Sequence, residues 1–568
     1  MIKDTLKLLI LFTGIIFISC ANNKQDKISE PDKVNGYSFG EEKTFYSDKP
    51  VSYPIFFSDA SWYPKLETWE SEGVFYQIQK LTNVKLDLIS FDSSIYNDSV
   101  MEALRKDQAA YIIPKIYSEG SFISTGKIVA ISDYTKYMPN FNAFVKKYNM
   151  EADLDTIRQS DGKFYRLPGL LQSPLQDYTL EVRQDIFEAA GFDIRELEKN
   201  WTWETLHDIL VVIKKYMVAN KMCKSEDYIW SDVWCGQSGK GSGGNLLKLI
   251  GSSYGVLSGW AIEGTYGGIW FNEKTKEFYS TSISDDYKKF VKVANSFIKD
   301  GLLDPATFSQ SDDVANELFY SGKTVIKSTN RSYIYLDGDN LIKKLGKDNF
   351  KLYVTVSPSG KNNYLSEINR LECGLMISQK AVNELGKEDF IKMLRFVDWM
   401  FYSEEAYSLV KWGPEHVTWH YEEEKGEKVK KLLPGLKNDS LVFLGNEGDV
   451  DTRLKWGYAC GNYFYGHSVA DITDNFTPNL RNLYVRFGKY KSTAKVAPAA
   501  RPTDDQREQL NAWADRLTIN INKWTLNFVL GEKDIDRDWD AYLESCKNLY
   551  VDDIVNLINK IYKEQNKK

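Results

Sequence analysis

The alternation of short apolar strands with helices is the sequence feature that most constrains how this chain folds. Residues 52–57, 84–89 and 109–113 have the apolar or alternating patterns of strands, and residues 70–81 and 99–106 have apolar side chains at helical spacing. Strands that are connected by helices favour βαβ units with a largely parallel sheet. The first part of the chain therefore predicts an α/β fold.

The same pattern starts again after residues 161–168 and continues towards the end of the chain. Thr202 is a suitable N-cap for a helix over 203–218, and Gly301 ends a strongly periodic helix over 285–300. Further strands are expected at 324–327 and 351–356, and further helices at 185–190, 388–402, 517–529 and 552–562. A chain of 568 residues is long enough for two core-bearing units, so the restart predicts two α/β units.

The first 20 residues have the pattern of an export and lipidation signal. Lys3 and Lys7 precede an apolar stretch at 8–18, which is too short to span a bilayer of about 30 Å. Ser19 then precedes Cys20, and a small residue before a cysteine at this point suits a lipoprotein signal peptidase. We expect that the Cys20 thiol takes a lipid; a cleaved signal peptide with a chance cysteine is the alternative.

Residues 21–48 hold too few apolar side chains to offset the entropy cost of ordering, so we expect a flexible tether there after the signal peptide at 1–20. The folded part would then begin near Val51. It would be anchored to the cell membrane by the lipid and would face a periplasm or the cell exterior.

Composition and charge exclude several classes of function. The formal net charge is −7, and no basic stripe of the kind that binds nucleic acid is present. Five cysteines besides Cys20 are widely spaced, and only four histidines occur, which leaves little material for zinc binding or histidine-based catalysis. We therefore expect no metal, no cofactor and no nucleic-acid partner. The 15 Trp, 35 Tyr and 29 Phe residues suggest a ligand with flat, weakly polar faces.

Two motifs carry weaker signals. Residues 239–244 satisfy G-x-G-x-x-G, but no clean strand precedes them, so we favour a glycine-rich lead into a helix at 245–250 over a nucleotide loop. The alternative is that its free N–H groups contact ligand hydroxyls or an anion. His416 and His420 are four residues apart, as zinc ligands on a helix would be, but Gly413 and Pro414 weaken the helix prediction. We expect His416 to be a polar contact of a ligand instead.

A series of short phrases occurs in a fixed order between about residues 160 and 550. The phrases are DGKFYRLP at 161–168, Arg183 and Asp185 before Gly191, TWETL at 202–206, DGLLDP at 300–305, FYSGK at 319–323, FVDWMF at 396–401, WGPEHVTW at 412–419, GEKD at 531–534 and WDAY at 539–542. In this order they resemble the bacterial extracellular solute-binding proteins of family 1, in the branch of large substrate-binding lipoproteins of carbohydrate ABC transporters. The calcium-type loop of many relatives is absent at 220–228, so no calcium is expected there.

The resemblance implies an α/β, two-lobed periplasmic-binding-protein-like fold, with a hinge and an interlobe cleft in which the ligand binds. The chain would cross between the lobes near Leu167, Lys327 and Cys373. The C-terminal helices could pack back on lobe 1 or on the hinge. The expected ranges are 49–168 and 328–372 for lobe 1, and 169–327 and 373–568 for lobe 2.

Candidate ligand contacts are aromatic residues beside polar groups at predicted strand-to-helix junctions, because ligands of open α/β sheets lie off the carboxyl ends of strands. Asp59, Trp62 and Tyr63 follow the first strand at such a point. Asp59 would bind sugar hydroxyls and Trp62 would stack on a pyranose face, with a place in the core as the alternative for Trp62. The resemblance adds candidate cleft positions at Tyr178, Trp234, Tyr254, Trp412, His416 and Trp419.

The resemblance implies a monomeric receptor that captures an oligosaccharide by hinge closure and presents the closed form to an ABC permease, with no catalytic residue and no enzyme activity. Two alternatives remain. One is a peptide ligand in the same architecture, marked by a cleft acid and base that hold the termini. The other is a secreted glycoside hydrolase, marked by two carboxylates about 5 to 10 Å apart in a groove. With 79 acidic residues in the chain, no such pair can be singled out.

Overall fold

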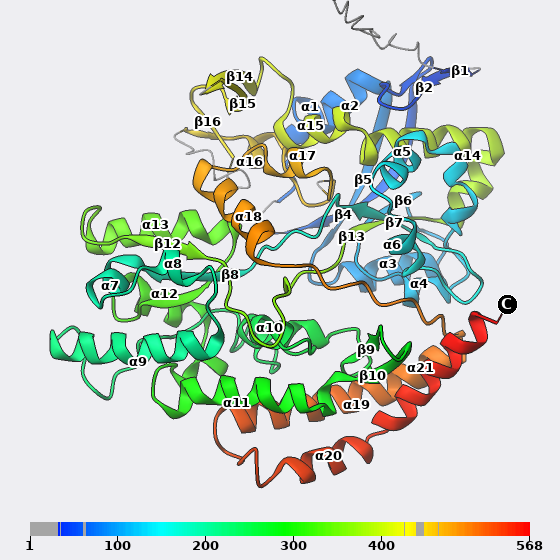
Figure 1. The fold of residues 1–568 in the computed structure, drawn as a ribbon. Helices are drawn as coiled ribbons and strands as arrows, with labels where there is room; N and C mark the ends of the chain where they lie inside the picture. Colours follow the sequence, from blue (N-terminus) through cyan, green and yellow to red (C-terminus); the bar gives the residue numbers. More distant parts are fainter. Residues whose placement is uncertain are drawn as a thin grey trace, which may run out of the picture.

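The chain forms two α/β lobes, which lie one above the other in Figure 1. The computed structural model describes residues 32–34, 36–60, 64–424, 426–438, 448–463 and 465–567. The predicted signal peptide with Cys20, as well as Trp62 and Tyr63, lies outside the described residues. Among the helices in these ranges, none has the length and apolar character that crossing a bilayer requires.

Lobe 1 contains a five-stranded sheet with the strand order β5-β4-β6-β13-β7. β4 is parallel to β5 over its whole length and parallel to β6, whereas β13 runs antiparallel to both β6 and β7. The sheet is therefore mixed, with a parallel half that matches the predicted βαβ units. Its strands are β4 (Val51–Asp59), β5 (Val84–Asp92), β6 (Ile112–Ile116), β7 (Arg166–Leu170) and β13 (Leu371–Ile377).

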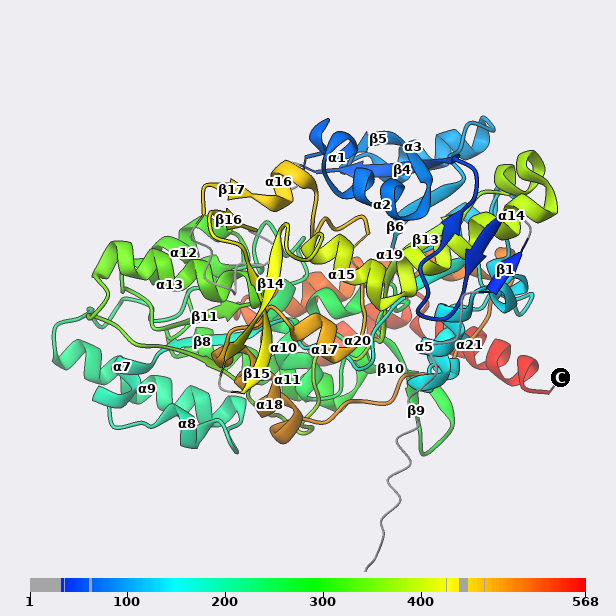
Figure 2. The same cartoon turned by 90° about the horizontal axis from the view of Figure 1, so that it is seen from above.

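Helices cover this sheet and form two apolar clusters with it. The helices of lobe 1 are α1 (Thr68–Ser71), α2 (Val74–Thr82), α3 (Tyr96–Arg105), α4 (Gly120–Ile123), α5 (Pro139–Lys147), α6 (Glu151–Asp155), α14 (Gln379–Tyr402) and α15 (Glu404–Trp412). The larger cluster includes Ile55, Trp69 and Phe396, and α3 and α4 form the smaller one with Phe56 and Met376. A hairpin, β14 (Trp419–Glu424) and β15 (Glu427–Leu432), and α16 (Thr452–Trp456) follow α15. Figure 2 shows the hairpin beside α15, and α16 contacts α1.

Lobe 2 contains a three-stranded sheet with the order β11-β8-β12, in which both outer strands are antiparallel to β8. The parallel sheet that the strand–helix alternation predicts is therefore wrong for this lobe. The strands are β8 (Thr179–Arg183), β11 (Ile326–Thr329) and β12 (Leu352–Thr355). Helices of very different sequence position cover them: α7 (Gln184–Ala189), α8 (Ile194–Leu197), α9 (Trp203–Ala219), α10 (Gly244–Ser253), α11 (Asp285–Lys299), α12 (Asp312–Tyr320) and α13 (Arg331–Leu345).

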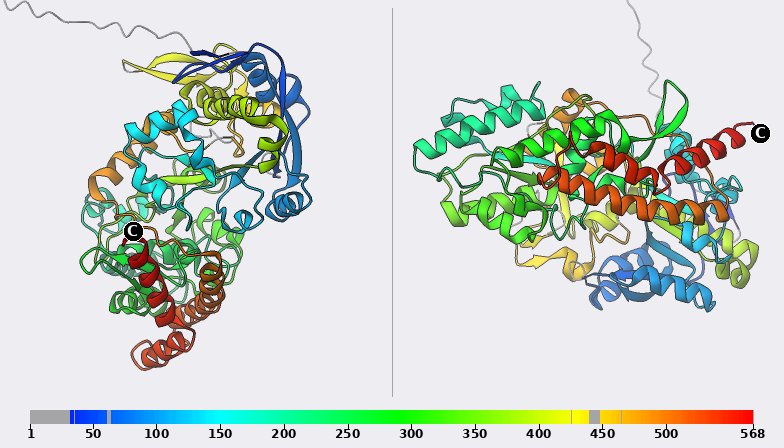
Figure 3. Two further views of the ribbon diagram at one scale, coloured as in Figure 1. Left: turned by 90° about the vertical axis from the view of Figure 1, so that its right-hand side faces the viewer. Right: turned by 90° about the horizontal axis from the view of Figure 1, so that it is seen from below.

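The C-terminal helices belong to lobe 2. They are α19 (Asp504–Val529), α20 (Trp539–Lys547) and α21 (Val551–Gln565), and they lie below the rest of the lobe in Figure 1 and along its underside in Figure 3. Leu517, Ile521 and Ile554 share one apolar core with Phe290 and Leu210. β10 (Glu277–Ser280), which pairs with β9 (Ile269–Asn272), packs against α21.

Two of the predicted lobe ranges differ from the structure. Residues 328–372 were assigned to lobe 1, but β12 pairs with β8 in lobe 2. Residues 373–568 were assigned to lobe 2, but β13 lies between β6 and β7, and α14 and α15 share the core of lobe 1. A strand pattern in one sequence does not reveal which other strand it pairs with. The local sequence around β13 therefore does not show to which lobe this strand belongs.

Within the described residues, the chain crosses between the lobes three times. The first crossing, 171–178, joins β7 to β8, and the second, 356–370, joins β12 to β13. These agree with the crossings predicted near Leu167 and Cys373. The crossing predicted near Lys327 is wrong, because β11 and the helices before and after it, α12 and α13, all pack in lobe 2. The third crossing runs through α17 (Val469–Thr473) to α18 (Pro478–Tyr490), which packs on lobe 2.

The tether prediction is wrong for its second half. β1 (Asp32–Val34), β2 (Tyr37–Phe39) and β3 (Tyr46–Ser47) form a small antiparallel sheet against lobe 1. Tyr37 and Phe45 are buried, and the Phe45 ring meets Phe396 of α14 edge-on at 5.6 Å. A few aromatic anchors thus order a segment whose overall composition is polar.

Candidate functional site

The two lobes enclose a cavity of about 730 Å³. Lobe 1 contributes the end of β6, the α6 region and β7, whereas lobe 2 contributes Tyr178, α10 and the start of α13. Segments of the first two crossings complete the lining. The polar and aromatic side chains that line the cavity are Lys115, Tyr117, Asp153, Thr156, Arg166, Asp177, Tyr178, Lys248, Arg331, Glu367, Asn369, Arg370 and Glu372.

Lys115 is the main cation of the lobe 1 wall. Its backbone φ is +62°, in the left-handed region that non-glycine residues rarely adopt. The strained conformation is held by two contacts: its N–H donates to the Tyr465 hydroxyl at 2.9 Å, and its ammonium donates to the Gly461 carbonyl at 3.0 Å. Strain of this kind persists where surrounding structure fixes it and is frequent at ligand sites.

The lobe 2 wall is aromatic. The Tyr178 ring meets Trp234 edge-on at 5.2 Å and Trp260 at 5.6 Å, and Trp234 in turn meets Tyr333 at 5.1 Å. The Lys248 ammonium lies 4.4 Å from the centre of the Tyr178 ring, within the range of a cation–π contact. Burial raises the pKa of Tyr178 to about 12, so its hydroxyl is a neutral donor and acceptor at physiological pH.

The glycine-rich segment at 239–244 has a structural role in this wall. Gly244 has a φ of +54°, and a Cβ there would lie 1.6 Å from the Trp234 carbonyl oxygen. The same oxygen accepts a hydrogen bond from the Asn245 N–H at 3.0 Å. Only glycine allows this close approach, so the segment both starts α10 and fixes Trp234, which itself has a φ of +60°.

Charged side chains of the cavity are held in pairs. Arg331 Nε lies 2.8 Å from Asp177 Oδ1, and Arg166 Nε lies 2.8 Å from Glu119 Oε2. The Lys248 ammonium pairs with Glu367, and Arg370 pairs with Asp153. The first pair joins α13 to the first crossing, and the last joins the second crossing to α6. The polar surface is therefore fixed in place before any ligand enters.

Glu372 lies at the start of β13, between the two lobes. Burial raises the pKa of its carboxyl group, and the cations Arg331 of lobe 2 and Lys115 of lobe 1 oppose that rise. A carboxylate near cations of both lobes accepts hydrogen bonds from any ligand that lies between them. Its environment depends on how close the lobes are to one another.

The cavity combines planar charged groups with an aromatic edge. Guanidinium and carboxylate groups can each make two hydrogen bonds to neighbouring polar atoms of a ligand. Aromatic rings bind the flat apolar faces of a ligand. Such a lining suits a hydroxyl-rich ligand that has apolar faces, and it also suits a ligand with charges of both signs.

Two of the predicted ligand contacts lie at this site. Tyr178 lines the cavity, and Trp234 packs directly behind it with 9% of its surface exposed. Tyr254 does not reach the site, because it lies in the core of lobe 2 and its hydroxyl donates to Glu204 Oε1 at 2.5 Å. Asp59, at the end of β4, accepts a hydrogen bond from the Lys65 N–H at 3.2 Å and does not line the cavity.

Trp412 and Trp419 are structural residues of lobe 1. Their exposed fractions are 0% and 4%, and each indole N–H has an internal acceptor: Asp474 Oδ2 at 2.8 Å for Trp412 and the Gly413 carbonyl at 2.8 Å for Trp419. The structure therefore packs both indoles inside lobe 1 and places neither of them at the interlobe cavity.

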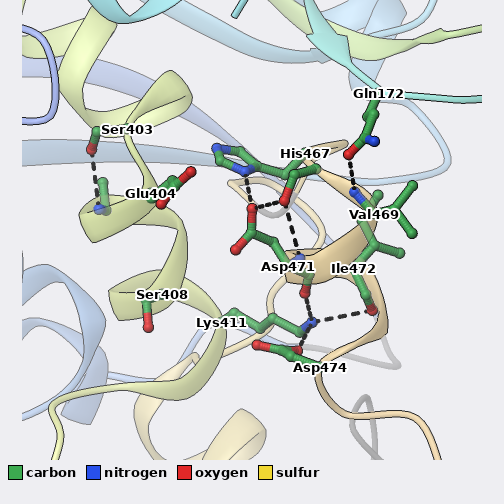
Figure 4. A network of polar contacts seen from close by, with 12 residues as sticks. Gln172, Ser403, Glu404, Ser408, Lys411, His467, Val469, Asp471, Ile472 and Asp474 are labelled. Carbon is green, nitrogen blue, oxygen red and sulfur yellow. Dashed lines mark hydrogen bonds and ion pairs between the residues drawn. The ribbon is translucent and has the colours of Figure 1, made fainter. Parts of the chain in front are cut away.

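Figure 4 shows the polar network beside Trp412. The Lys411 ammonium donates to the Asp471 carbonyl at 2.6 Å and pairs with Asp474 at 2.5 Å. His416 lies nearby on the connection to β14, with 81% of its side chain exposed, and it does not line the interlobe cavity. The prediction of His416 as a cleft contact is not supported by this position.

The charged residues of the cavity were not among the predicted contacts. Arg331 begins the helix after β11, and Lys115 lies at the end of β6, so both follow predicted strands. The rule that placed Asp59 at a strand end could have found them. Within the described part of the chain, no group of three or more His, Cys, Asp or Glu side chains could hold a metal ion.

No protein-family model matches the sequence, and no curated protein matches it. Solved structures are similar over nearly the whole chain. The alginate-binding protein AlgQ2 has 17% identity and a TM-score of 0.62, with 91% of this chain and 99% of that chain covered. An HMO-binding, ABC-transporter-associated solute-binding protein from Bifidobacterium longum infantis has 15% identity and a TM-score of 0.65, with 90% and 98% covered.

A third similar structure is the S. pneumoniae ABC-transporter substrate-binding protein FusA in complex with kestose, with 14% identity, a TM-score of 0.59 and coverage of 91% and 100%. The three share the fold over about nine tenths of this chain. The chain therefore has the two-lobed α/β fold of solute-binding proteins.

Proposed function

We propose that this protein is the lipid-anchored solute-binding receptor of an ABC importer, of the family 1 type, and that it captures an oligosaccharide in the interlobe cavity. The observation that carries the proposal is the cavity itself, because paired charged side chains and the Tyr178 ring line the space between two lobes joined by three crossings. Whole-chain similarity to proteins whose titles name alginate, HMO and kestose as ligands supports it.

The proposed mechanism uses binding and hinge closure, with no bond made or broken. Ligand hydroxyls would bridge Lys115 and Glu372 on one side and Arg331 on the other, and a sugar face would lie against Tyr178. Because these contacts come from both lobes, ligand binding would favour the closed arrangement. A permease would then recognise the closed form, and the monomer would stay attached to the membrane through Cys20.

Titration of a glycan library tests this proposal, with tryptophan fluorescence as the readout because Trp234 and Trp260 lie behind Tyr178. At least one glycan should change the signal saturably. The Tyr178→Ala/Arg331→Ala variant should lose that response. His416→Ala is the matched control, since this exposed side chain lies outside the cavity, and it should respond as the wild type does.

A peptide ligand is the second candidate, because the cavity holds acids and bases that could bind both termini, such as Asp177 and Lys115. Saturable binding of a peptide library with no response to any glycan would favour it. Steady turnover of a chromogenic glycoside by the wild type would instead favour a hydrolase and contradict a purely binding role.

Lipidation is tested separately. Metabolic labelling with a fatty-acid analogue should label the wild type, and Cys20→Ala should abolish the label and release the protein from membranes. A wild type that is recovered entirely in the soluble secreted fraction without label would favour an ordinary cleaved signal peptide.

A further inference from the structure

A second cavity, of about 660 Å³, lies on lobe 2 between α8, α13, β12 and α18. None of its lining residues also lines the interlobe cavity. An apolar cluster separates the two: Leu171 and Leu175 of this cluster line the interlobe cavity, and Leu480 and Leu483 line the second one. The second cavity is thus built by lobe 2 and α18 alone, and the approach of the lobes does not form it.

The floor of this cavity is rigid. Glu198 is 3% exposed and accepts hydrogen bonds from the Tyr353 hydroxyl at 2.7 Å, the Val356 N–H at 2.9 Å and Arg486 Nη1 at 2.7 Å. Arg486 also donates to the Val354 carbonyl at 2.9 Å, which holds α18 against β12. A floor whose polar groups are already satisfied loses little entropy when a ligand binds above it.

Tyrosine rings and amides also line this cavity. The Tyr353 ring lies between guanidinium groups of the lining, with Arg486 at 4.8 Å and Arg195 at 5.7 Å from its centre. Tyr335 and Tyr490 also line the cavity and are half-buried, and the amides of Asn479 and Asn482 lie at its rim.

The chemistry of this lining indicates the class of ligand. A sugar ring has one flat C–H face and an edge of hydroxyls, so it needs an aromatic ring beside amide or carboxylate groups. Tyrosine rings and aliphatic side chains line the cavity together with three acidic and three basic residues, Glu196, Glu198, Asp339, Arg195, Lys199 and Arg486, whose formal charges cancel and suit a neutral ligand. The volume is that of a site for a small molecule.

Gly338 keeps this cavity open. It lies inside α13, where glycine costs about 1 kcal/mol of helix stability relative to alanine. A Cβ at this position would meet no atom within 4 Å, so no neighbouring group requires glycine. Because Gly338 lines the cavity, a larger side chain there would project into space that a ligand can use.

We propose that this cavity is a second carbohydrate-binding site, specific for a neutral monosaccharide or disaccharide unit and independent of lobe closure. It does not depend on which ligand the interlobe cavity binds.

Saturation-transfer difference NMR on the full mature chain tests this site, with glucose, galactose, mannose, N-acetylglucosamine and their common disaccharides as probes. Tyr178→Ala/Arg331→Ala is the background variant, so that the interlobe cavity contributes no signal. We expect at least one probe to give a signal in this background. Adding Gly338→Leu should weaken that binding at least about tenfold.

Gly488→Leu is the matched control. Gly488 is also a helix glycine whose Cβ would meet nothing within 4 Å, but it lies on the exposed side of α18 and does not line the cavity. This control should keep the signal, and neither leucine variant should lower the melting temperature. A signal that survives Gly338→Leu unchanged, or no signal from any probe, overturns the second site. Failure of the interlobe proposal is seen separately, as the absence of a fluorescence response in the wild type.

Discussion

Lysine ammonium groups lie over aromatic rings both at the lobe 2 wall of the interlobe cavity and beside the β14–β15 hairpin of lobe 1. In the first, Lys248 lies 4.4 Å from the Tyr178 ring centre. In the second, Lys430 lies 5.0 Å from the Trp419 ring and 5.7 Å from the Trp412 ring. The sequence assigned the same role to both aromatic groups.

The two regions differ in what surrounds the rings. At the hairpin, both indoles are buried with internal acceptors for their N–H groups, and Asp474 pairs with Lys411 and Lys430. At the cavity, Tyr178 lines open space. The same type of contact is therefore enclosed by packing at the hairpin and borders a cavity at Tyr178, where the ring is accessible to a ligand. Substitutions in the two regions should separate stability from binding.

The largest expected effect is the loss of stability in Trp412→Ala. Removing a fully buried tryptophan leaves a cavity and takes one hydrogen bond from Asp474, which keeps its pairs with Lys411 and Lys430, and should lower the free energy of unfolding by about 3 to 5 kcal/mol. Urea unfolding followed by circular dichroism measures this. Trp260→Ala, at a half-buried ring of the cavity wall, is the control and should cost less. A Trp412→Ala protein of unchanged stability that no longer binds glycan would reverse the comparison.

The next effect is a pH dependence that arises at Lys411. Burial lowers the pKa of the Lys411 ammonium from 10.5 to about 8 in the folded protein. Between about pH 8 and 10.5 the unfolded chain therefore binds more protons than the folded chain, so this group's contribution to stability rises with pH. The unfolding free energy of the wild type minus that of Lys411→Met should increase over this window by as much as about 3 kcal/mol. Urea midpoints at intervals of pH measure the difference, and a flat difference would show that Lys411 is not desolvated.

Some features of the fold could be predicted from the sequence and others could not. The periodic segments became helices and strands near the predicted positions, as α9 with its Thr202 N-cap and α11 illustrate. The lobe of β13 was not predictable, because its partners β6 and β7 lie more than two hundred residues earlier in the chain. Pairing over such distances depends on the tertiary fold and leaves no local pattern.

At the site, the sequence indicated Tyr178 and Trp234 but also Tyr254, Trp412 and Trp419, which are buried elsewhere. The number of aromatic residues suggested a ligand with flat faces, but most of these side chains lie in the apolar cores of the two lobes. The charged residues of the cavity were missed because a chain with 151 acidic and basic side chains offers no local reason to choose Arg331 or Glu372 (79 Asp and Glu plus 72 Lys and Arg). These charged residues become neighbours only because the fold brings the two lobes together at the crossings.

A smaller effect than those on stability is expected from Arg331→Ala, which should change binding alone. The substitution removes a planar cation from the lobe 2 wall and leaves Asp177 with a partner missing, so the affinity for the glycan found in the library should fall about a hundredfold. Arg331→Lys keeps the positive charge but lacks the planar set of N–H donors of a guanidinium, so it should recover only part of the lost affinity. Calorimetric titration measures both. An unchanged affinity in Arg331→Ala would show that the ligand does not contact the start of α13.

The smallest effect is expected from Tyr178→Leu, which keeps apolar volume but removes the ring and its hydroxyl. Affinity should fall about tenfold, because one stacking contact and one hydrogen bond together contribute roughly 1 to 2 kcal/mol. Tyr178→Phe keeps the ring and should lose less, while Trp419→Phe in the hairpin region should leave affinity unchanged, since Trp419 does not line the cavity. Calorimetry on the three variants ranks them. If Trp419→Phe weakened binding more than Tyr178→Leu, the hairpin would have to contact the ligand, and the uncovered face of the ring would not be what distinguishes the two regions.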